Sequence, residues 1–261
     1  MIKLRSLLYA IAFYVSTAIF LIGGSWLFAA PRSWAMQGLR VHGLFCTWLL
    51  KVICGTRMEV RGAGKLTDRP CLVVSKHQSA WDTFALIPVF RDPAIVLKEE
   101  LKHIPLYGWF CVKFEHILVQ RGRAAVALRQ MVSDAKERAS QGREVFIFPE
   151  GTRRPPGAEP DYKPGYIALY EGLGVTCYPV ALNSGLYWPR RKLTRYPGTI
   201  VVEILDPIPA GLPRAEFRQR VEQAIEAASD RLLLEAVDKD RVPVPKDVLE
   251  QVQARQAKTR T

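Results

Sequence analysis

The most constraining feature of this 261-residue chain is an uncharged apolar stretch near its N-terminus. Residues 6–31 hold no charged side chain, and Lys3 and Arg5 precede them. At ~1.5 Å rise per residue, a helix of this length can cross a hydrocarbon core about 30 Å thick. A signal peptide is the alternative, but its apolar region usually has only ~7–15 residues. We therefore expect an uncleaved membrane anchor, and the sequence leaves open whether residues 6–31 span the bilayer or only enter it.

A second apolar stretch follows at residues 41–55. It is shorter and contains Lys51, so we expect it to dip into the membrane or lie along it. The two stretches predict a membrane-associated helical segment over residues 1–56.

Charge and cysteine content narrow the class further. The chain has 37 Lys and Arg against 25 Asp and Glu, a net charge of +12 that points to anionic partners: a phospholipid surface, a phosphorylated substrate or nucleic acid. The five cysteines form no C-x-x-C pair, which indicates a reducing compartment and predicts neither a disulfide framework nor a metal site.

From Met58 onward the pattern is typical of an α/β domain. Short apolar runs predict strands at 71–75, 94–98, 116–121, 144–150, 175–182 and 198–205. Helical patterns lie at 80–88, 100–112, 124–142 and 214–238. This alternation predicts a mostly parallel central sheet flanked by helices over residues 57–240, followed by a polar, frayed tail at 241–261.

The segment "SKHQSAWDTFALI" places His77 and Asp82 directly after a predicted strand. If His77 lies in the turn and Asp82 in the first helical turn, the two side chains can meet as a base and its orienting acid. Ser79 is a good N-cap, however, and Asp82 at that spacing completes a capping box. The alternative is therefore an ordinary loop histidine before a helix start, and the pair alone does not decide between them.

Other chemically active side chains also follow predicted strands. "FPEGTRR" at 148–154 contains Glu150, Gly151, Thr152 and Arg153, while Lys98 and Arg121 end two further strands. In open parallel sheets, ligand sites gather at the carboxyl ends of the strands. Each residue taken singly is also compatible with a solvated surface.

Taken in order, these motifs resemble a known family. H-x4-D, a strand ending in Arg, F-P-E-G-T-R and a strand with "YPVAL" are similar to the glycerolipid acyltransferases, and within them to the 1-acylglycerol-3-phosphate acyltransferases. The resemblance covers nearly the whole chain. Two positions depart from the family pattern: Lys76 stands where Asn is common, and "EHILVQR" lacks the usual Gly and acidic residue before Arg121.

The resemblance implies transfer of a fatty acyl group from acyl-CoA or acyl-carrier protein to the sn-2 hydroxyl of 1-acylglycerol-3-phosphate, giving phosphatidate. His77 would act as general base, with Asp82 fixing its tautomer and supporting the imidazolium. The substrate's own hydroxyl would replace the serine of a Ser-His-Asp triad. No cofactor and no metal are implied.

The same resemblance assigns substrate-binding residues. Lys98, Arg121 and Arg153 would bind the acceptor phosphate. Glu150 would bind a glycerol hydroxyl or hold an arginine, in a turn that includes Gly151 and Thr152.

The expected location is a membrane, because both lipids reside in a bilayer. We expect a bacterial-type inner membrane with the catalytic domain on the cytoplasmic face. The basic segment "PRRKLTR" at 189–195 either contacts anionic headgroups or is a solvated loop.

Two rival functions remain at this stage. One is a related acyltransferase with another acceptor: glycerol-3-phosphate, another lysophospholipid or an amino-acid lipid. The other is a membrane-tethered nucleic-acid-binding protein, suggested by the +12 charge. The basic residues are dispersed and no nucleic-acid motif with interleaved aromatics is present, so we expect no nucleic-acid partner.

Overall fold

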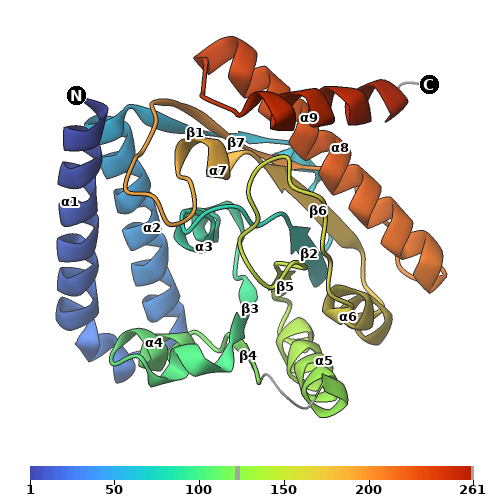
Figure 1. Ribbon diagram of the computed structural model, residues 1–261. Coiled ribbons are helices and arrows are strands. Elements are labelled where there is room, and N and C mark those ends of the chain that lie inside the picture. The colour runs from blue at the N-terminus through green and yellow to red at the C-terminus, as the bar shows by residue number, and fades with distance from the viewer. Residues whose placement is uncertain (121–123, 260–261) are drawn as a thin grey trace.

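A computed structural model describes residues 1–120 and 124–259 and contains a seven-stranded sheet with helices packed around it (Figure 1). The strands are β1 Thr56–Arg61, β2 Cys71–Ser75, β3 Ala94–Lys98, β4 Ile117–Val119, β5 Glu144–Ile147, β6 Cys177–Leu182 and β7 Gly198–Ile204. The α-helices are α1 Ile2–Gly23, α2 Arg32–Cys54, α3 Asp82–Ala85, α4 Tyr107–Lys113, α5 Ala124–Ser140, α6 Gly165–Leu173, α7 Ser184–Tyr187, α8 Arg214–Asp240 and α9 Lys246–Thr259. Short 3₁₀ turns lie at Ser25–Phe28, Ala63–Lys65, Ile87–Val89 and Glu99–His103.

The sheet has the order β1-β7-β6-β2-β5-β3-β4. Every neighbouring pair is parallel except β6 and β7, which are antiparallel. The predicted α/β class, with a mostly parallel sheet flanked by helices, is confirmed. β1 was not predicted, because its sequence "TRMEVR" alternates charged residues on an edge strand and contains no apolar run.

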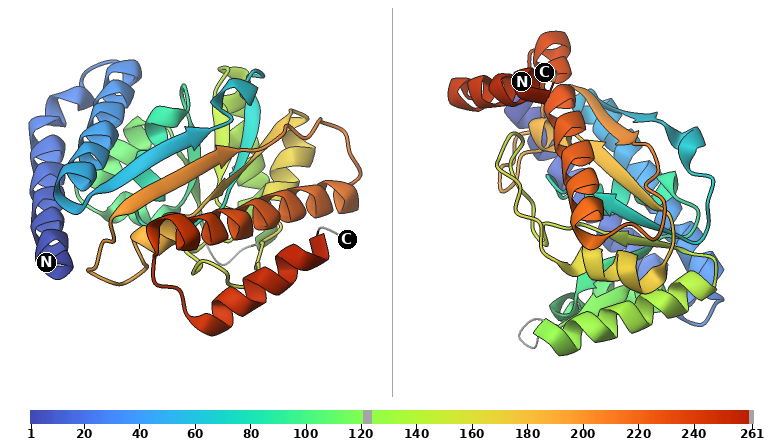
Figure 2. Two further views of the ribbon diagram at one scale, coloured as in Figure 1. Left: turned by 90° about the horizontal axis from the view of Figure 1, so that it is seen from above. Right: turned by 90° about the vertical axis from the view of Figure 1, so that its right-hand side faces the viewer.

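Alternate residues of the central strands pack into two separate apolar layers. Val73 and Phe146 face the layer that contains α2 and α3, whereas Leu72 and Val145 face the layer that contains α5, α6 and the first half of α8. Figure 2 shows these helices on the two faces of the sheet. Because both faces are covered, β2 and β5 are buried along their whole length, as parallel strands usually are.

Several predicted element bounds differ from the structure. The helix expected at 100–112 is divided into a 3₁₀ turn, which ends at His103, and α4, because Pro105 lacks a backbone N–H and restricts the residue before it. The helix expected at 80–88 has its one α-helical turn at Asp82–Ala85. The strand expected at 144–150 ends at Ile147, and the chain then turns through Gly151.

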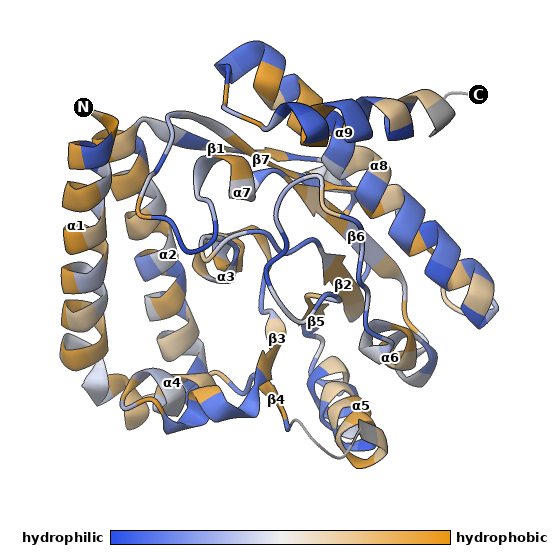
Figure 3. Cartoon of the chain, in the orientation of Figure 1, coloured by the Kyte–Doolittle hydropathy of each residue, from blue (hydrophilic) through white to orange (hydrophobic). Residues whose placement is uncertain are grey.

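Helices α1 and α2 lie side by side at one edge of the molecule (Figure 1). Within the described ranges, α1 is the one helix long and apolar enough to cross a membrane, and 17% of its most apolar window is buried. Figure 3 shows apolar residues along its length. α2 begins at Arg32 and ends at Cys54, so it contains the second apolar stretch except Gly55, which follows as its C-cap.

The C-terminal tail contains a helix, so the expectation of a frayed tail is wrong over residues 246–259. Val248 and Val252 of α9, four residues apart, pack against the core beside α8. Arg255 forms an ion pair of 2.8 Å with Asp230, whose side chain is buried. The apolar stripe is short, which is why composition alone did not reveal it.

Candidate active site

The residues predicted from strand ends do meet at one edge of the sheet. β6, β2, β5, β3 and β4 are mutually parallel neighbours, so their carboxyl ends lie together. His77 follows β2 by two residues, Glu150 follows β5 by three, and Lys98 is the last residue of β3. Lys98 pairs in register with Val119 of β4. Arg121 lies outside the described residues.

His77 and Asp82 are in direct contact. Nδ1 of His77 lies 2.9 Å from Oδ2 of Asp82, and the aspartate is 1% exposed. The imidazole stacks on Phe148 with ring centroids 4.1 Å apart. Since Nδ1 is bound to the aspartate, Nε2 is the ring nitrogen available to a substrate.

Asp82 accepts hydrogen bonds from several directions. Its Oδ2 also accepts the backbone N–H groups of Gln78 and Ser79, at 2.8 and 2.9 Å, and its Oδ1 accepts the hydroxyl of Ser184 at 2.5 Å. Three neutral donors thus hold the carboxylate in place and leave His77 as its fourth partner. The helix-start alternative is correct in part, because Asp82 is the first residue of α3. Ser79 is not the N-cap; its Oγ accepts the N–H of Trp81.

Glu150 is buried beneath the histidine loop rather than exposed to solvent. Its Oε1 lies 3.0 Å from Nζ of Lys76, and its Oε2 accepts the backbone N–H of His77 at 3.3 Å. The carboxylate is 1% exposed. Burial raises the pKa of Glu150, and the Lys76 ammonium opposes that rise.

The turn after Glu150 connects the histidine loop to the basic loop at 189–195. Gly151 has φ of +60°, a conformation that glycine adopts without strain. Thr152 and Arg153 are half-buried, and the backbone carbonyl of Arg153 accepts a hydrogen bond of 2.9 Å from Arg190. The next residue, Arg154, donates its backbone N–H to the carbonyl of His77 at 2.8 Å.

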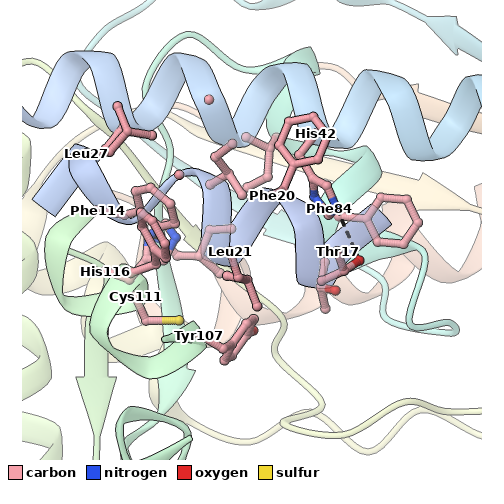
Figure 4. Close-up of a pocket in the computed structure, with 18 of the residues that line it drawn as sticks. Thr17, Phe20, Leu21, Leu27, His42, Phe84, Tyr107, Cys111, Phe114 and His116 are labelled. Carbon is pink, nitrogen blue, oxygen red and sulfur yellow. Dashed lines mark hydrogen bonds between the residues drawn. The ribbon is translucent and has the colours of Figure 1, made fainter. Parts of the chain in front are cut away.

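An apolar cavity of about 460 Å³ opens beside the histidine. It lies between the α1–α2 hairpin, α4 and the end of β3, and Phe148, the ring that stacks on His77, is part of its wall. Figure 4 shows Leu21 and Tyr107 facing each other across it, with His42 hydrogen-bonded to Thr17. Cavities of this volume and composition are typical of small-molecule sites.

Sequence reasoning missed Ser184 and the partners of Lys76. Ser184 follows the predicted strand 175–182 by two residues, as His77 follows its own strand. This position after a strand could have marked Ser184 as a candidate site residue. All five cysteines are buried and free. In the two described ranges, no three His, Cys, Asp or Glu side chains gather as metal ligands would.

The site combines a buried histidine–aspartate pair, a cationic sheet edge and an apolar cavity. This combination suits the deprotonation of a polar group that is attached to a long apolar chain. A family model described as "Acyltransferase" matches residues 57–183. The chain is 38% identical over 198 residues to the 1-acyl-sn-glycerol-3-phosphate acyltransferase of Pseudomonas aeruginosa, with 76% of each chain covered. The chain belongs to the acyltransferase family.

Two further relatives agree with this assignment. The crystal structure of the 1-acyl-sn-glycerophosphate acyltransferase from Thermotoga maritima superposes with a TM-score of 0.74 at 26% identity, covering 89% of this chain and 98% of that one. The lyso-ornithine lipid O-acyltransferase of Pseudomonas aeruginosa is 27% identical, with 69% of this chain and 76% of the relative covered. This acyltransferase therefore has relatives that differ in the acceptor lipid they are named for.

Proposed function

We propose that this acyltransferase moves a fatty acyl group from a thioester donor to the sn-2 hydroxyl of 1-acylglycerol-3-phosphate, giving phosphatidate. The observation that carries the proposal is the His77–Asp82 pair, whose imidazole stacks on Phe148, a residue of the cavity wall. The similarity to acyltransferases named for this acceptor supports the choice of lipid.

His77 acts as the general base in this mechanism. Nε2 takes the proton of the acceptor hydroxyl as its oxygen attacks the thioester carbonyl. When the tetrahedral intermediate collapses, the C–S bond breaks and the imidazolium returns the proton to the departing thiolate. Asp82 holds the tautomer that presents Nε2 and stabilises the transient positive charge. These steps need no cofactor, and the acyl donor is a substrate.

The apolar cavity is proposed to hold a fatty acyl chain. Residues from α1, α2 and α4 line it, and it meets the histidine at Phe148. Burying a chain there removes its apolar surface from water, which stabilises the complex by about 25 cal/mol per Å² buried. This contribution favours long-chain over short-chain thioesters.

The cationic edge of the sheet is proposed to bind the acceptor phosphate. Lys98 and Arg153 lie at this edge, and Arg121 follows β4, the strand next to Lys98. Arginine can pair with phosphate through two parallel hydrogen bonds. Glu150 has both oxygens engaged by Lys76 and His77, so we propose that it supports the loop, with Gly151 and Thr152 shaping the turn beside the substrate.

The N-terminal helices associate with a membrane, and we propose that they lie within one leaflet. α1 is tied to the α/β domain at its start, where Ser6 accepts the N–H of Arg195. Lys113 of α4 binds the carbonyls of Phe28 and Ala30 just beyond its end. The 22 residues of α1 cover ~33 Å. If α1 crossed the bilayer, its two attachments would lie on opposite sides of the membrane. The charged domain could reach both only by entering the hydrocarbon core. Quenching of Trp34 and Trp48 by brominated lipids tests this depth.

We further propose that the α/β domain faces the cytoplasm of a bacterial-type cell. Five free, buried cysteines suit a reducing compartment, and acyl-CoA and acyl-carrier protein are the donors proposed above. Protease protection in right-side-out and inverted membrane vesicles tests the orientation.

A different acceptor is the second candidate for this site. The similarity to a lyso-ornithine lipid acyltransferase favours an amino-acid lipid as the alternative, and glycerol-3-phosphate or another lysophospholipid would fit the same base. Competition among these acceptors at equal concentration separates the candidates.

The test is transfer of labelled acyl groups by the purified protein. Wild type and His77→Ala are compared with acyl-CoA and acyl-carrier protein as donors, with and without a chelator, after circular dichroism shows that both fold. Phosphatidate formed by wild type and lost in His77→Ala supports the proposal. Equal activity of the two proteins would show that His77 is not the base.

A further inference from the structure

A buried charge network lies directly beneath the histidine loop. Lys76, the residue before His77, is 2% exposed, and its ammonium contacts two carboxylates: Glu150 at 3.0 Å and Glu226 of α8 at 2.6 Å. Tyr162 donates its hydroxyl to the same oxygen of Glu226, and its ring lies 5.6 Å from the ammonium. The cation is therefore enclosed by partners from the turn after β5, from α8 and from the loop before α6.

The network reaches His77 through Glu150. Lys76 binds one oxygen of Glu150, and the other oxygen accepts the backbone N–H of His77. The backbone carbonyl of His77 is fixed in turn by the N–H of Arg154. Both peptide groups of the histidine are thus held by the segment that follows β5, while Asp82 holds its ring. The position of Nε2 depends on all three contacts.

Only a long cation can make this bridge. An asparagine at position 76, the residue common in the resembling family, is shorter and carries no charge. Without the ammonium, Glu150 and Glu226 would face each other in a buried space with no cation between them. The nearest charged groups to Glu226 along α8 are Glu222 and Asp230. Glu222 is paired with Arg218 and accepts the hydroxyl of Tyr166, and Asp230 is paired with Arg255.

We infer that Lys76 is a positioning residue, which holds Glu150 and Glu226 together so that the loop presents His77 to the substrate. This inference rests on the proposed role of His77 as base. Lys76 itself contacts no reacting atom, so its effect is on kcat rather than on the KM for the lysolipid. Glu226 and Tyr162 complete the network from the side of α8.

The kinetic test uses Lys76→Met, which keeps the length of the side chain and removes its charge. Loss of the bridge lets the histidine loop shift, and a shift of about 1 Å can cost on the order of 10²-fold in rate. Burial raises the pKa of Glu150, and the variant lacks the Lys76 ammonium that opposes this rise. Glu150 therefore becomes more fully ionised as the pH increases, and the ratio of wild-type to variant kcat should widen from pH 6 to pH 8.5. Adding Glu226→Gln removes one of the two repelling charges and should narrow that ratio.

The matched control is Arg231→Met on α8, the helix that carries Glu226. Arg231 also joins two carboxylates, Glu203 and Glu235, each at 2.7 Å, but it is 41% exposed and lies on β7's side of α8. Arg231→Met should therefore leave kcat and the pH profile of kcat unchanged. If Lys76→Met does not fold, Lys76→Gln, which keeps one amide donor, replaces it in the same comparison.

A readout independent of activity separates this inference from the proposed function. In protein labelled at the histidine nitrogens, the His77 signals are identified by their absence in His77→Ala. Wild type should carry its proton on Nδ1, and Lys76→Met should change that signal while Arg231→Met does not. A pH-independent loss of kcat without recovery in the double variant, a rise in KM alone, or an unchanged His77 signal would each overturn the inference. Activity retained in His77→Ala would instead overturn the proposed function.

Discussion

The hydroxyl of Ser184 donates a hydrogen bond of 2.5 Å to Oδ1 of Asp82, although the two residues lie 102 positions apart. They meet because Ser184 follows β6 and Asp82 follows β2, and these strands are parallel neighbours. Both side chains are almost fully buried. This hydrogen bond holds the carboxylate through Oδ1, whereas His77 contacts Oδ2.

Replacing Ser184 with Ala should therefore lower kcat by about tenfold. A hydrogen bond to a charged group contributes ~1.5–3 kcal/mol, and ~1.36 kcal/mol corresponds to a factor of ten. Steady-state assays check this, with Ser229→Ala as control. Ser229 is also buried, and its hydroxyl has no hydrogen-bond partner within the described residues. Equal effects of the two substitutions would contradict a role for the Ser184–Asp82 bond.

Narrowing the apolar cavity should change the preference for acyl-chain length. Leu21 lines the cavity, whereas its neighbour Ile22 is 66% exposed. We expect Leu21→Trp to lower kcat/KM for long-chain donors by at least about tenfold and to affect short-chain donors much less. Ile22→Trp adds the same ring outside the cavity and should leave the preference unchanged. Parallel losses with all donors would argue against this cavity as the acyl site.

Replacing Gly157 with a larger residue should destabilise the fold, because Gly157 lies against Val248 and Val252 of α9. Its φ is +75°, and an added Cβ would lie 2.5 Å from Cγ1 of Val248. Gly211 has φ of +85° with open space around it, so Gly211→Ala reports the backbone strain alone, roughly 1–2 kcal/mol. Gly157→Ala should cost a further ~1–3 kcal/mol from overpacking, as measured by urea unfolding. Equal losses would mean that α9 does not press on this loop.

An ion pair joins the helical hairpin to the sheet in a pH-dependent way. Arg32 of α2 makes two hydrogen bonds to Asp92, at 2.8 and 2.6 Å. Burial would raise the pKa of Asp92, but the hydrogen bond from Arg32 and the charges of Arg143 and Arg32 outweigh it and lower that pKa. A lowered carboxyl pKa stabilises the fold above the unfolded-state pKa of ~3.9, and this stability is lost as the pH falls through the folded-state pKa.

Arg32→Met should accordingly lower Tm at pH 7, by an amount equivalent to about 1 kcal/mol, and the difference from wild type should shrink towards pH 3. Thermal unfolding in detergent across this pH range measures it. Arg220→Met, which removes an exposed pair with Glu216 on α8, is the control and should change Tm little at any pH. A difference that persists unchanged at pH 3 would show that Arg32 acts through packing instead.

The sequence by itself determined the alternation of strands and helices and which polar residues follow the strands. His77, Glu150 and Lys98 were found because apolar runs mark strands, and because parallel neighbouring strands bring the residues at their carboxyl ends to one edge of the sheet. The same reasoning missed β1, whose residues alternate charge, and α9, whose apolar stripe is short.

Only the tertiary structure decided which distant side chains meet. Strand order and helix packing decide the hydrogen bond between Ser184 and Asp82 and the ion pair between Lys76 and Glu226. They also form the cavity between α1, α2 and α4. The tertiary structure also decided that α1 is attached to the α/β domain at both ends. The physical reason is that backbone periodicity is local and can be read along the chain. A contact between residues many positions apart exists only once burial of the apolar faces has fixed the neighbours of each strand.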